Sequence, residues 1–255
     1  MEYRTLTKSQ KLIKLTTPQG EIFWMLYTEE RTLVETRSGD SNEVHSDDLN
    51  IRLVTAGASH RDMTPGAEIM SMRGHASGYG SRTVNFSDGY IVVEDPWKGL
   101  RIGTYMMNRL VIWAKENYPD YQPVGIRLGV NQAVNAEWRQ RRNKFYGRFN
   151  FRFNWNGDDQ VEGSLCEDQF VKDLRTTDLW KGLIEEFAVE DGLRMIFAEA
   201  RGAELRAAEA DRRADAAVDA RIYAEQVVSR ARSINIRWGV IGFAIGMILS
   251  MIIFG

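Results

Sequence analysis

The feature that most limits how this chain can fold is a long segment, residues 179–236, that is rich in Ala, Glu, Asp and Arg and contains few turn-forming residues. Oppositely charged residues recur four apart in it, as in Glu190/Arg194 and Arg221/Glu225, and such pairs lie side by side on a helix. The apolar stripe is thin, because alanine replaces larger side chains in its middle. We predict one long helical stalk, a coiled coil that forms a homo-oligomer.

The C-terminal stretch 238–255 carries no charged residue. As a helix it would be about 27 Å long, close to the thickness of the hydrocarbon core of a bilayer. Arginines precede it and Trp238 stands at the expected interface, so the positive-inside rule would keep the rest of the protein cytoplasmic. The sequence therefore predicts a single-pass C-terminal transmembrane anchor over residues 237–255, with the membrane as a partner. The alternative is a terminal helix buried in an oligomer.

Composition excludes several classes of protein. The formal net charge is -2 and the sequence pI is about 6.0, so a general nucleic-acid-binding function is not expected. The single cysteine, Cys166, rules out an intrachain disulfide framework. The three histidines lie apart in the sequence, and no metal site is expected. The N-terminus has no apolar run of the kind found in signal peptides.

Residues 1–178 alternate short apolar strand patterns with turn signals, and two helical patterns lie among them. This mixture predicts an α/β (α+β) domain. The expected strands are two about the turn "TPQG" within 11–27, one at 50–56, a hairpin over 80–95 that turns at Ser87-Asp88-Gly89, one at 124–130 and one at 149–155. The expected helices are 103–116 and about 132–147.

The segment "VVEDPWKGLRIGTYMMNRLVIWAKE" combines a strand, a glycine-containing loop and an amphipathic helix. Gly99 and Gly103 leave room for a phosphate, the helix N-terminus supplies unpaired N–H groups, and Lys98 and Arg101 add positive charge. Arg101 stands where a glycine would be most permissive. The loop would retain binding if Arg101 takes a negative φ, and would be a degenerate binder if it does not.

This segment resembles the acetyl-CoA-binding segment of the GNAT acyltransferases, with Trp97, Lys98, Gly99, Ile102 and Gly103 matching and Arg101 replacing the central glycine. The segment "GIRLGVNQAVNAEWRQRRNKFYGRFNFRF" is similar to the next strand and helix of that family, where Asn150 replaces a glycine. The resemblance implies a GNAT-like mixed central sheet flanked by helices. It implies an acetyl-CoA site formed by Val93, Trp97, Lys98, Gly99, Leu100, Arg101, Ile102, Gly103, Thr104 and Asn131, with Asn135 as an alternative to Asn131.

For catalysis, the resemblance places Tyr146 as the acid that protonates the leaving thiolate, and a core tyrosine is the alternative. Glu94, at the strand end, is the candidate general base, with Asp95 and His75 as weaker candidates. The alternative for Glu94 is an exposed turn residue, and the alternative for His75 is a solvated loop histidine.

The resulting hypothesis is a membrane-tethered GNAT-like N-acyltransferase that transfers an acetyl group from acetyl-CoA to an amine of a protein or small molecule. A non-catalytic GNAT-like module, such as a component of a phage virion or a secretion assembly, is the alternative from another class. A toxin-like acetyltransferase that acts on tRNA is a third, which the near-neutral charge disfavours.

Overall fold

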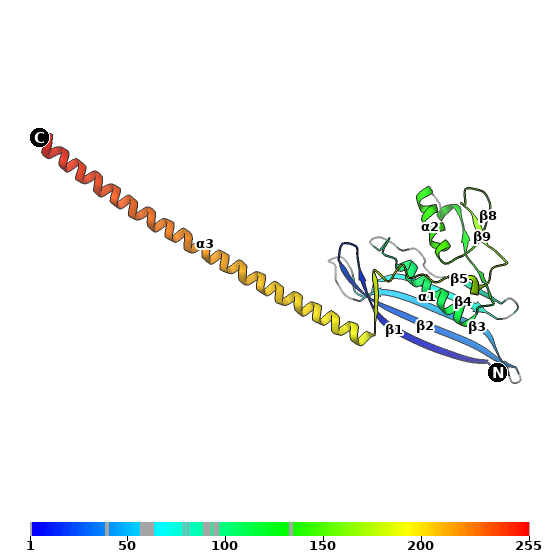
Figure 1. Cartoon of the computed structure of the whole chain (residues 1–255). Coiled ribbons are helices and arrows are strands. Elements are labelled where there is room, and N and C mark those ends of the chain that lie inside the picture. Colours follow the sequence, from blue (N-terminus) through cyan, green and yellow to red (C-terminus); the bar gives the residue numbers. More distant parts are fainter. Residues whose placement is uncertain are drawn as a thin grey trace. The chain divides into compact units, whose positions relative to one another are not determined.

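The computed structural model describes residues 2–38, 41–56, 64–78, 80, 82–88, 93, 97–132 and 135–254. The chain divides into two units, residues 1–194 and 195–255. Figure 1 traces the elements along the chain. The first unit contains every strand that the structure describes, and the second consists of the greater part of one helix.

A seven-stranded sheet forms the frame of the first unit, in the order β10-β1-β2-β3-β4-β5-β6. Neighbouring strands are antiparallel except β5 and β6, which are parallel and are connected through helix α1. The strands are β1 (Glu2–Thr16), β2 (Ile22–Ser38), β3 (Ser41–Thr55), β4 (Glu68–Ser77), β5 (Thr83–Asp88), β6 (Gln122–Val124) and β10 (Ile184–Phe187).

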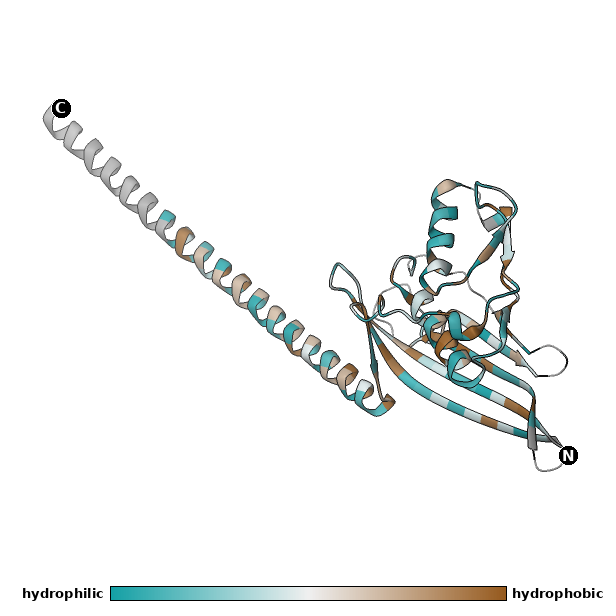
Figure 2. Ribbon diagram, turned by 45° about the vertical axis from the view of Figure 1, so that its right-hand side comes forward, coloured by the Kyte–Doolittle hydropathy of each residue, from teal (hydrophilic) through white to brown (hydrophobic). Residues whose placement is uncertain are grey.

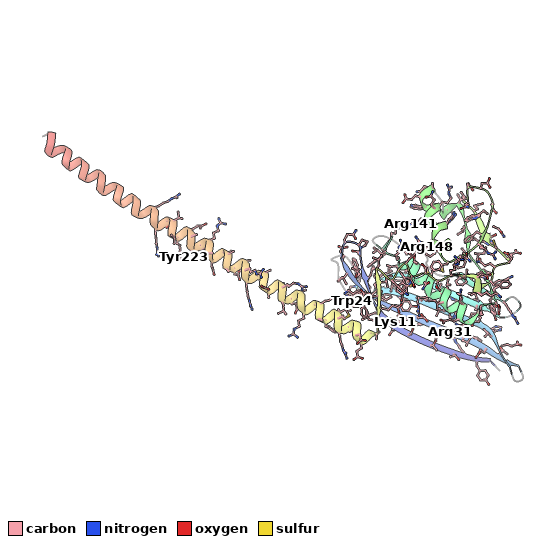
Figure 3. The ribbon with its side chains drawn as sticks, viewed as in Figure 1. Lys11, Trp24, Arg31, Arg141, Arg148 and Tyr223 are labelled. Carbon is pink, nitrogen blue, oxygen red and sulfur yellow. The ribbon has the colours of Figure 1, made fainter. Side chains whose placement is uncertain are left out.

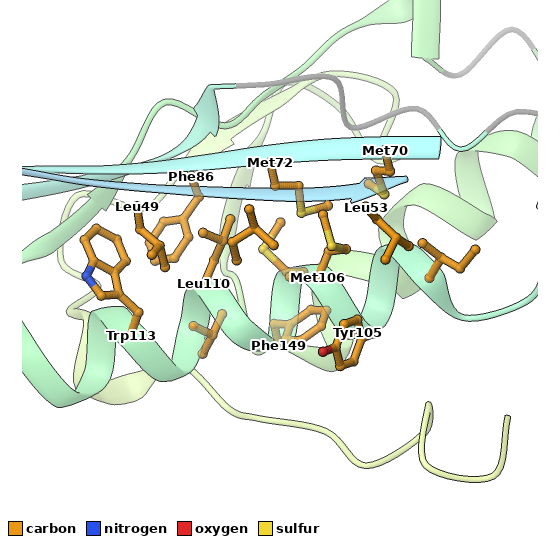
Figure 4. Close-up of a cluster of buried hydrophobic side chains, with 14 of the residues drawn as sticks. Leu49, Leu53, Met70, Met72, Phe86, Tyr105, Met106, Leu110, Trp113 and Phe149 are labelled. Atoms are coloured by element: carbon orange, nitrogen blue, oxygen red, sulfur yellow. The ribbon is translucent and has the colours of Figure 1, made fainter. Parts of the chain in front are cut away.

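One face of this sheet is covered by α1 (Ile102–Asn117). The strands alternate in polarity along β1–β3, as Figure 2 shows, and this period of two directs every second side chain to α1. Leu49, Leu53 and Met72 from the sheet meet Met106 and Leu110 from the helix (Figure 4). At Gly74 a Cβ atom would lie 2.5 Å from the Trp113 ring, so only glycine permits this close approach of helix and sheet.

A smaller sheet has the strand order β7-β9-β8, and its strands come before and after helix α2 in the sequence. Apolar side chains of this sheet extend the hydrophobic core of the domain. Its strands are β7 (Arg127–Leu128), β8 (Phe153–Trp155) and β9 (Gly163–Leu165), and α2 spans Ala136–Arg148. Short 3-10 turns, η1 (Val130–Gln132) and η2 (Val171–Asp173), complete the connections. Arg142 fixes α2 to this region by donating to the carbonyl oxygens of Gly129, Gln160 and Val161.

Several sequence predictions are confirmed. The helix expected at 103–116 is α1, and the predicted stripe Met107, Leu110, Val111 and Ala114 is completely buried. The helix expected at about 132–147 is α2, and the strands about "TPQG" are β1 and β2 with Gly20 at φ 84° in their turn. The hairpin turn was predicted at Ser87-Asp88-Gly89. The prediction is wrong for Ser87 and Asp88, because both belong to β5, and Gly89 lies outside the described residues.

The helices cover the two faces of the large sheet unequally. The fold is a mixed α+β fold in which α1 packs along one face, whereas on the other face Gly192, near the start of α3 (Val189–Phe254), contacts Leu12 of β1. The face opposite α1 carries solvent-exposed ion pairs, Lys8–Glu30 at 2.6 Å and Arg52–Glu68 at 2.7 Å, among the described residues. Charged side chains of this kind are not covered by a packed helix, because burial would cost them their hydration.

The predicted membrane anchor is also corrected. Within the part of the chain that the structure describes, no helix is both long enough and apolar enough to cross a lipid bilayer, so the prediction of a transmembrane helix and the membrane localisation drawn from it are not upheld. α3 (Val189–Phe254) is a single helix of 66 residues, and its described side chains, which end at residue 232, are mostly alanine or charged and mostly exposed; charged side chains of this kind do not enter the hydrocarbon core of a bilayer. The uncharged stretch is the end of this helix, and the side chains of residues 233–254 lie outside the description.

Candidate functional site

The loop at residues 97–101 connects the core of the domain to the first turn of α1. Trp97 is buried and packs edge-to-face on Phe23 of β2, with ring centroids 5.1 Å apart. Gly99 has a φ of 84°, a conformation that glycine adopts without strain. The backbone N–H of Leu100 donates to the carbonyl oxygen of Trp97 at 3.4 Å, which closes a turn. The buried Trp97 thus fixes one end of a loop whose other end is a helix N-terminus.

Arg101 is the N-terminal cap of α1 and takes the left-handed conformation, with φ 64° and ψ 9°. A working phosphate loop was expected only with a negative φ at this residue, and the φ of 64° does not meet that condition. Its carbonyl oxygen accepts the first helical hydrogen bond, from the N–H of Tyr105 at 2.9 Å. A left-handed arginine costs roughly 1–2 kcal/mol. The backbone of Arg101 is therefore strained.

The start of α1 has no neutralising group of its own. No side chain caps it, and its first turn contains no acidic residue. The N–H groups of this turn and the helix dipole give the site a partial positive charge.

Two arginines of α2 extend this positive charge. A guanidinium nitrogen of Arg141 lies 3.8 Å from the point where a Cβ atom of Gly99 would stand, so Arg141 lies over the loop. The pKa of Arg148 is lowered by its partial burial and by the charge of Arg101 nearby. Figure 3 shows Arg141 and Arg148 on α2. The two residues are seven apart, which places them on one face of the helix.

Arg101, Arg141 and Arg148 form what we call the arginine cluster. Among the described residues, none of the three makes an ion pair or a side-chain hydrogen bond. Like charges gathered without a carboxylate repel each other, and an anion that binds among them relieves this repulsion. The cluster is therefore suited to a ligand that carries phosphate or several carboxylates.

A pocket of about 390 Å³ borders the same loop. It lies between the β1–β2 turn and the loop, and its apolar wall includes Phe23 and Trp97. Its full lining is Thr17, Pro18, Gln19, Glu21, Phe23, Trp97, Lys98, Gly99 and Leu100. Gly99 thus borders both the pocket and the arginine cluster, so that one ligand could place an anionic group at the cluster and an apolar or aromatic group in the pocket.

The structure brings together part of the predicted acetyl-CoA site. Lys98 is exposed on the loop, Leu100 is half-buried, and Ile102 and Thr104 are buried under the start of α1. A Cβ atom at Gly103 would lie 3.6 Å from Val93 and 3.8 Å from Phe145 of α2, so α1, α2 and Val93 meet at this glycine. Glu94 and Asp95 lie outside the described residues.

The two candidate asparagines differ in role. Asn131 is exposed in the η1 turn. Asn135 caps α2, and its side-chain oxygen accepts a hydrogen bond from the N–H of Trp138 at 2.8 Å. The structural function of a cap explains Asn135 without a ligand.

Tyr146 lies in an aromatic cluster. Its ring contacts Phe145, Phe151 and Phe153 with centroids 5.1, 5.9 and 5.7 Å away. Burial raises the pKa of its hydroxyl, and the charge of Arg142 only partly opposes this rise. A raised pKa makes the hydroxyl a weaker proton donor, which favours the core-packing interpretation over the catalytic one.

Two further predicted positions have structural explanations. Asn150 takes φ 61° after the end of α2 and donates to the carbonyl oxygen of Asp173 at 2.8 Å, so asparagine fills the left-handed position that glycine usually takes. His75 accepts or donates at Nδ1 to Asp48, 2.9 Å away, on the face of the sheet opposite α1. The structure therefore does not bring His75 to the loop.

Arg141 and Arg148 were not predicted as site residues. Their seven-residue spacing, which puts both on one face of a helix, was available in the sequence as a signal. What the sequence could not show was that this face packs against Gly103 through Phe145 and so overhangs the loop.

Comparison with known proteins adds no relative. No family model, curated protein or solved structure matches this chain.

Proposed function

We propose that the first unit binds a phosphate-bearing ligand of the acyl-CoA class at the start of α1. The observation that carries the proposal is the arginine cluster, which places three unpaired guanidinium groups beside an uncapped helix N-terminus. The neighbouring pocket, with its Phe23 and Trp97 wall, offers an apolar surface for the rest of such a ligand. The chain order also supports this class of ligand. The loop and α1 form the connection between β5 and β6, which pair in parallel.

The reaction proposed with this ligand is acyl transfer to an amine. The amine nitrogen would attack the thioester carbonyl carbon, the carbon–sulfur bond would break, and the thiolate would take up a proton while the amine loses one. The resemblance of residues 92–116 and 125–153 to the GNAT family supports this reaction. A membrane tether is not part of the proposal.

A second candidate function is a binding module without catalysis. One observation favours it: Tyr146 lies within an aromatic cluster, where burial raises the pKa of its hydroxyl and makes it a poor proton donor. In this case the ligand would bind and no acyl group would be transferred.

Isothermal titration of the full chain with acetyl-CoA tests binding. We expect saturable binding that weakens by about tenfold or more in an Arg141→Ala, Arg148→Ala double variant, because each lost charge-assisted hydrogen bond is worth about 1.5–3 kcal/mol. Arg139→Ala is the matched control, since Arg139 lies on α2 but on the opposite side from Arg141 and Arg148. Absence of binding at millimolar ligand, or equal affinity in all variants, would refute the proposal.

Turnover separates the two functions. Release of free CoA in the presence of a panel of amines, detected with a thiol reagent, would support acyl transfer. Saturable binding without release of CoA for any amine would identify a binding module.

A further inference from the structure

A second pocket, of about 250 Å³, lies at the opposite end of α1 and has no part in the proposed function. It is formed where the outer halves of β1 and β2 pass beside the last turns of the helix. Its lining comprises Thr7, Lys8, Ser9, Glu29, Arg31, Arg109, Ile112, Trp113, Glu116 and Asn117. The pocket is small, polar and charged, which suits a ligand of a few heavy atoms.

Each cation in the lining is already paired. Lys8 is 2.6 Å from Glu30 on the face of the sheet opposite α1, and Arg109 is 3.3 Å from Glu29. Arg31 is 2.7 Å from the buried carboxylate of Asp47 and donates to the side-chain oxygen of Asn117 at 2.9 Å. The positive charge of the lining is therefore balanced by carboxylates within the protein.

The two carboxylates of the lining keep acceptor oxygens that no described residue fills, although Glu29 is paired with Arg109. Tyr27 and Arg109 both donate to the same oxygen of Glu29, Oε2, so that Oε1 has no donor among the described residues. Glu116 has no ion pair or hydrogen bond to any residue in the described ranges. Glu116 also stands in the last turn of α1, where the helix dipole is negative and favours a cation.

An anion is a poor alternative occupant. The Nε atom of Arg109 has no hydrogen-bond partner among the described residues, but it is buried and so does not face the open pocket. An anion would have to compete with Glu29 for Arg109 and with Asp47 for Arg31, and would lie close to the unpaired Glu116.

We propose that this pocket binds a small aliphatic primary amine. The ammonium group lies between Glu29 Oε1 and Glu116, and the alkyl part lies against Ile112 and Trp113. An ammonium group has three donors, which matches the unfilled acceptors of the two carboxylates.

Titration of the full chain with butylamine, and separately with butyrate as its anionic counterpart, tests this proposal. We expect butylamine to bind, and Glu116→Gln to weaken it by about fivefold, as expected for a partly exposed ion pair worth up to about 1 kcal/mol. Glu137→Gln, another exposed helical glutamate that lies on α2, is the control and should leave the affinity unchanged.

A Glu29→Gln variant gives an independent measurement, and its circular dichroism melt shows whether the fold is retained. Since Glu116 is exposed, Glu116→Gln is not expected to unfold the chain, and its result decides the test alone if Glu29→Gln does not fold. Failure of butylamine to bind, stronger binding of butyrate, or equal amine affinity in Glu116→Gln and the wild type would each overturn the proposal. None of these outcomes depends on whether acetyl-CoA binds at the other end of α1.

Discussion

At the scale of single residues, Asp47 is the most heavily bonded buried charge among the described side chains. It is 0% exposed and accepts hydrogen bonds from Arg31, from Trp113 Nε1 at 3.2 Å and from the Tyr118 hydroxyl at 2.6 Å. Its carboxylate thus connects β3 to β2 and to the end of α1. Both carboxylate oxygens of Asp47 accept hydrogen bonds. Removal of this carboxylate leaves the Arg31 guanidinium, the Trp113 N–H and the Tyr118 hydroxyl without this acceptor.

We predict that Asp47→Ala lowers the free energy of unfolding by about 3–5 kcal/mol, because it leaves Arg31 partly buried and unpaired. Asp47→Asn keeps the volume and one acceptor, and should cost less. Urea unfolding followed by tryptophan fluorescence measures both. A loss for Asp47→Ala no larger than that of an exposed variant such as Asp178→Ala would show that the network contributes little.

Arg101 offers a prediction in which stability and binding change in opposite directions. Arg101→Gly removes the strain of a left-handed arginine and should raise the free energy of unfolding by up to about 1 kcal/mol, since glycine adopts this φ freely. The same change removes a charge from the arginine cluster and should weaken acetyl-CoA binding. Arg101→Ala should weaken binding without the gain in stability. Tighter binding in Arg101→Gly would show that the backbone, and not the charge, limits the site.

Asp48 gives a prediction for pH. Burial tends to raise the pKa of this carboxyl group, but hydrogen bonds from Arg73 and His75 outweigh it and lower the pKa below the usual 3.8. A carboxyl group with a lower pKa in the folded state stabilises the protein above its unfolded pKa, and this contribution is lost as the pH falls through the folded value. We expect Asp48→Asn to flatten the fall in stability below about pH 4. An unchanged acid slope in melts from neutral to acidic pH would contradict this.

At the scale of elements, α2 is positioned by its cap as well as by packing. Asn135→Ala removes the acceptor of the Trp138 N–H and should cost about 1 kcal/mol, as measured for other N-caps. Because α2 carries Arg141 and Arg148, the same change should also weaken acetyl-CoA binding. Asn131→Ala, at an exposed turn position, should alter stability little. Thermal melts and titrations of the two variants compare the cap with the position that the family resemblance selects.

The elements also show which parts of the fold a sequence can predict. The buried stripe of α1 was predictable, because every residue of it obeys the helical period and contacts one sheet. The outer half of β1, residues 3–10, was not, because its side chains are exposed and only pairing with β2 maintains it. The arginine cluster was predictable only in part. The sequence shows that Arg141 and Arg148 share one face of a helix, but it does not show that Phe145 packs on Gly103 and brings this face to the loop.

At the scale of the whole molecule, α3 is too long and too exposed to be explained by its own contacts. Large apolar side chains stand free along it, with Phe197 and Tyr223 each 70% exposed. Isolated helices are marginally stable in water, and long natural helices gain stability from partners. Intrahelical pairs such as Glu209–Arg213 supply only tenths of a kcal/mol each.

The order of small residues indicates how a second copy of this helix would pack. From Leu193 onward, small or apolar residues recur at alternating intervals of three and four residues. Ile196 comes first and Arg221 ends the series; between them every such position is alanine, namely Ala200, Ala203, Ala207, Ala210, Ala214 and Ala217. This is the spacing of the seam of a coiled coil, and alanine allows the backbones of two helices to approach closely. The predicted homo-oligomer would form along this seam.

We therefore expect the full chain to be an oligomer and residues 1–194 to be a monomer, as measured by light scattering after size-exclusion chromatography. Ala203→Glu with Ala210→Glu places two charges on the seam and should dissociate the oligomer, whereas Ala208→Glu, beside the seam, should not. If the full chain is monomeric, or if the seam and control variants behave alike, α3 does not associate through this face.

The first unit contains the arginine cluster and both pockets, so acetyl-CoA should bind residues 1–194 and the full chain with the same affinity per chain. Weaker binding by the shorter chain would mean that assembly through α3 contributes to the ligand site.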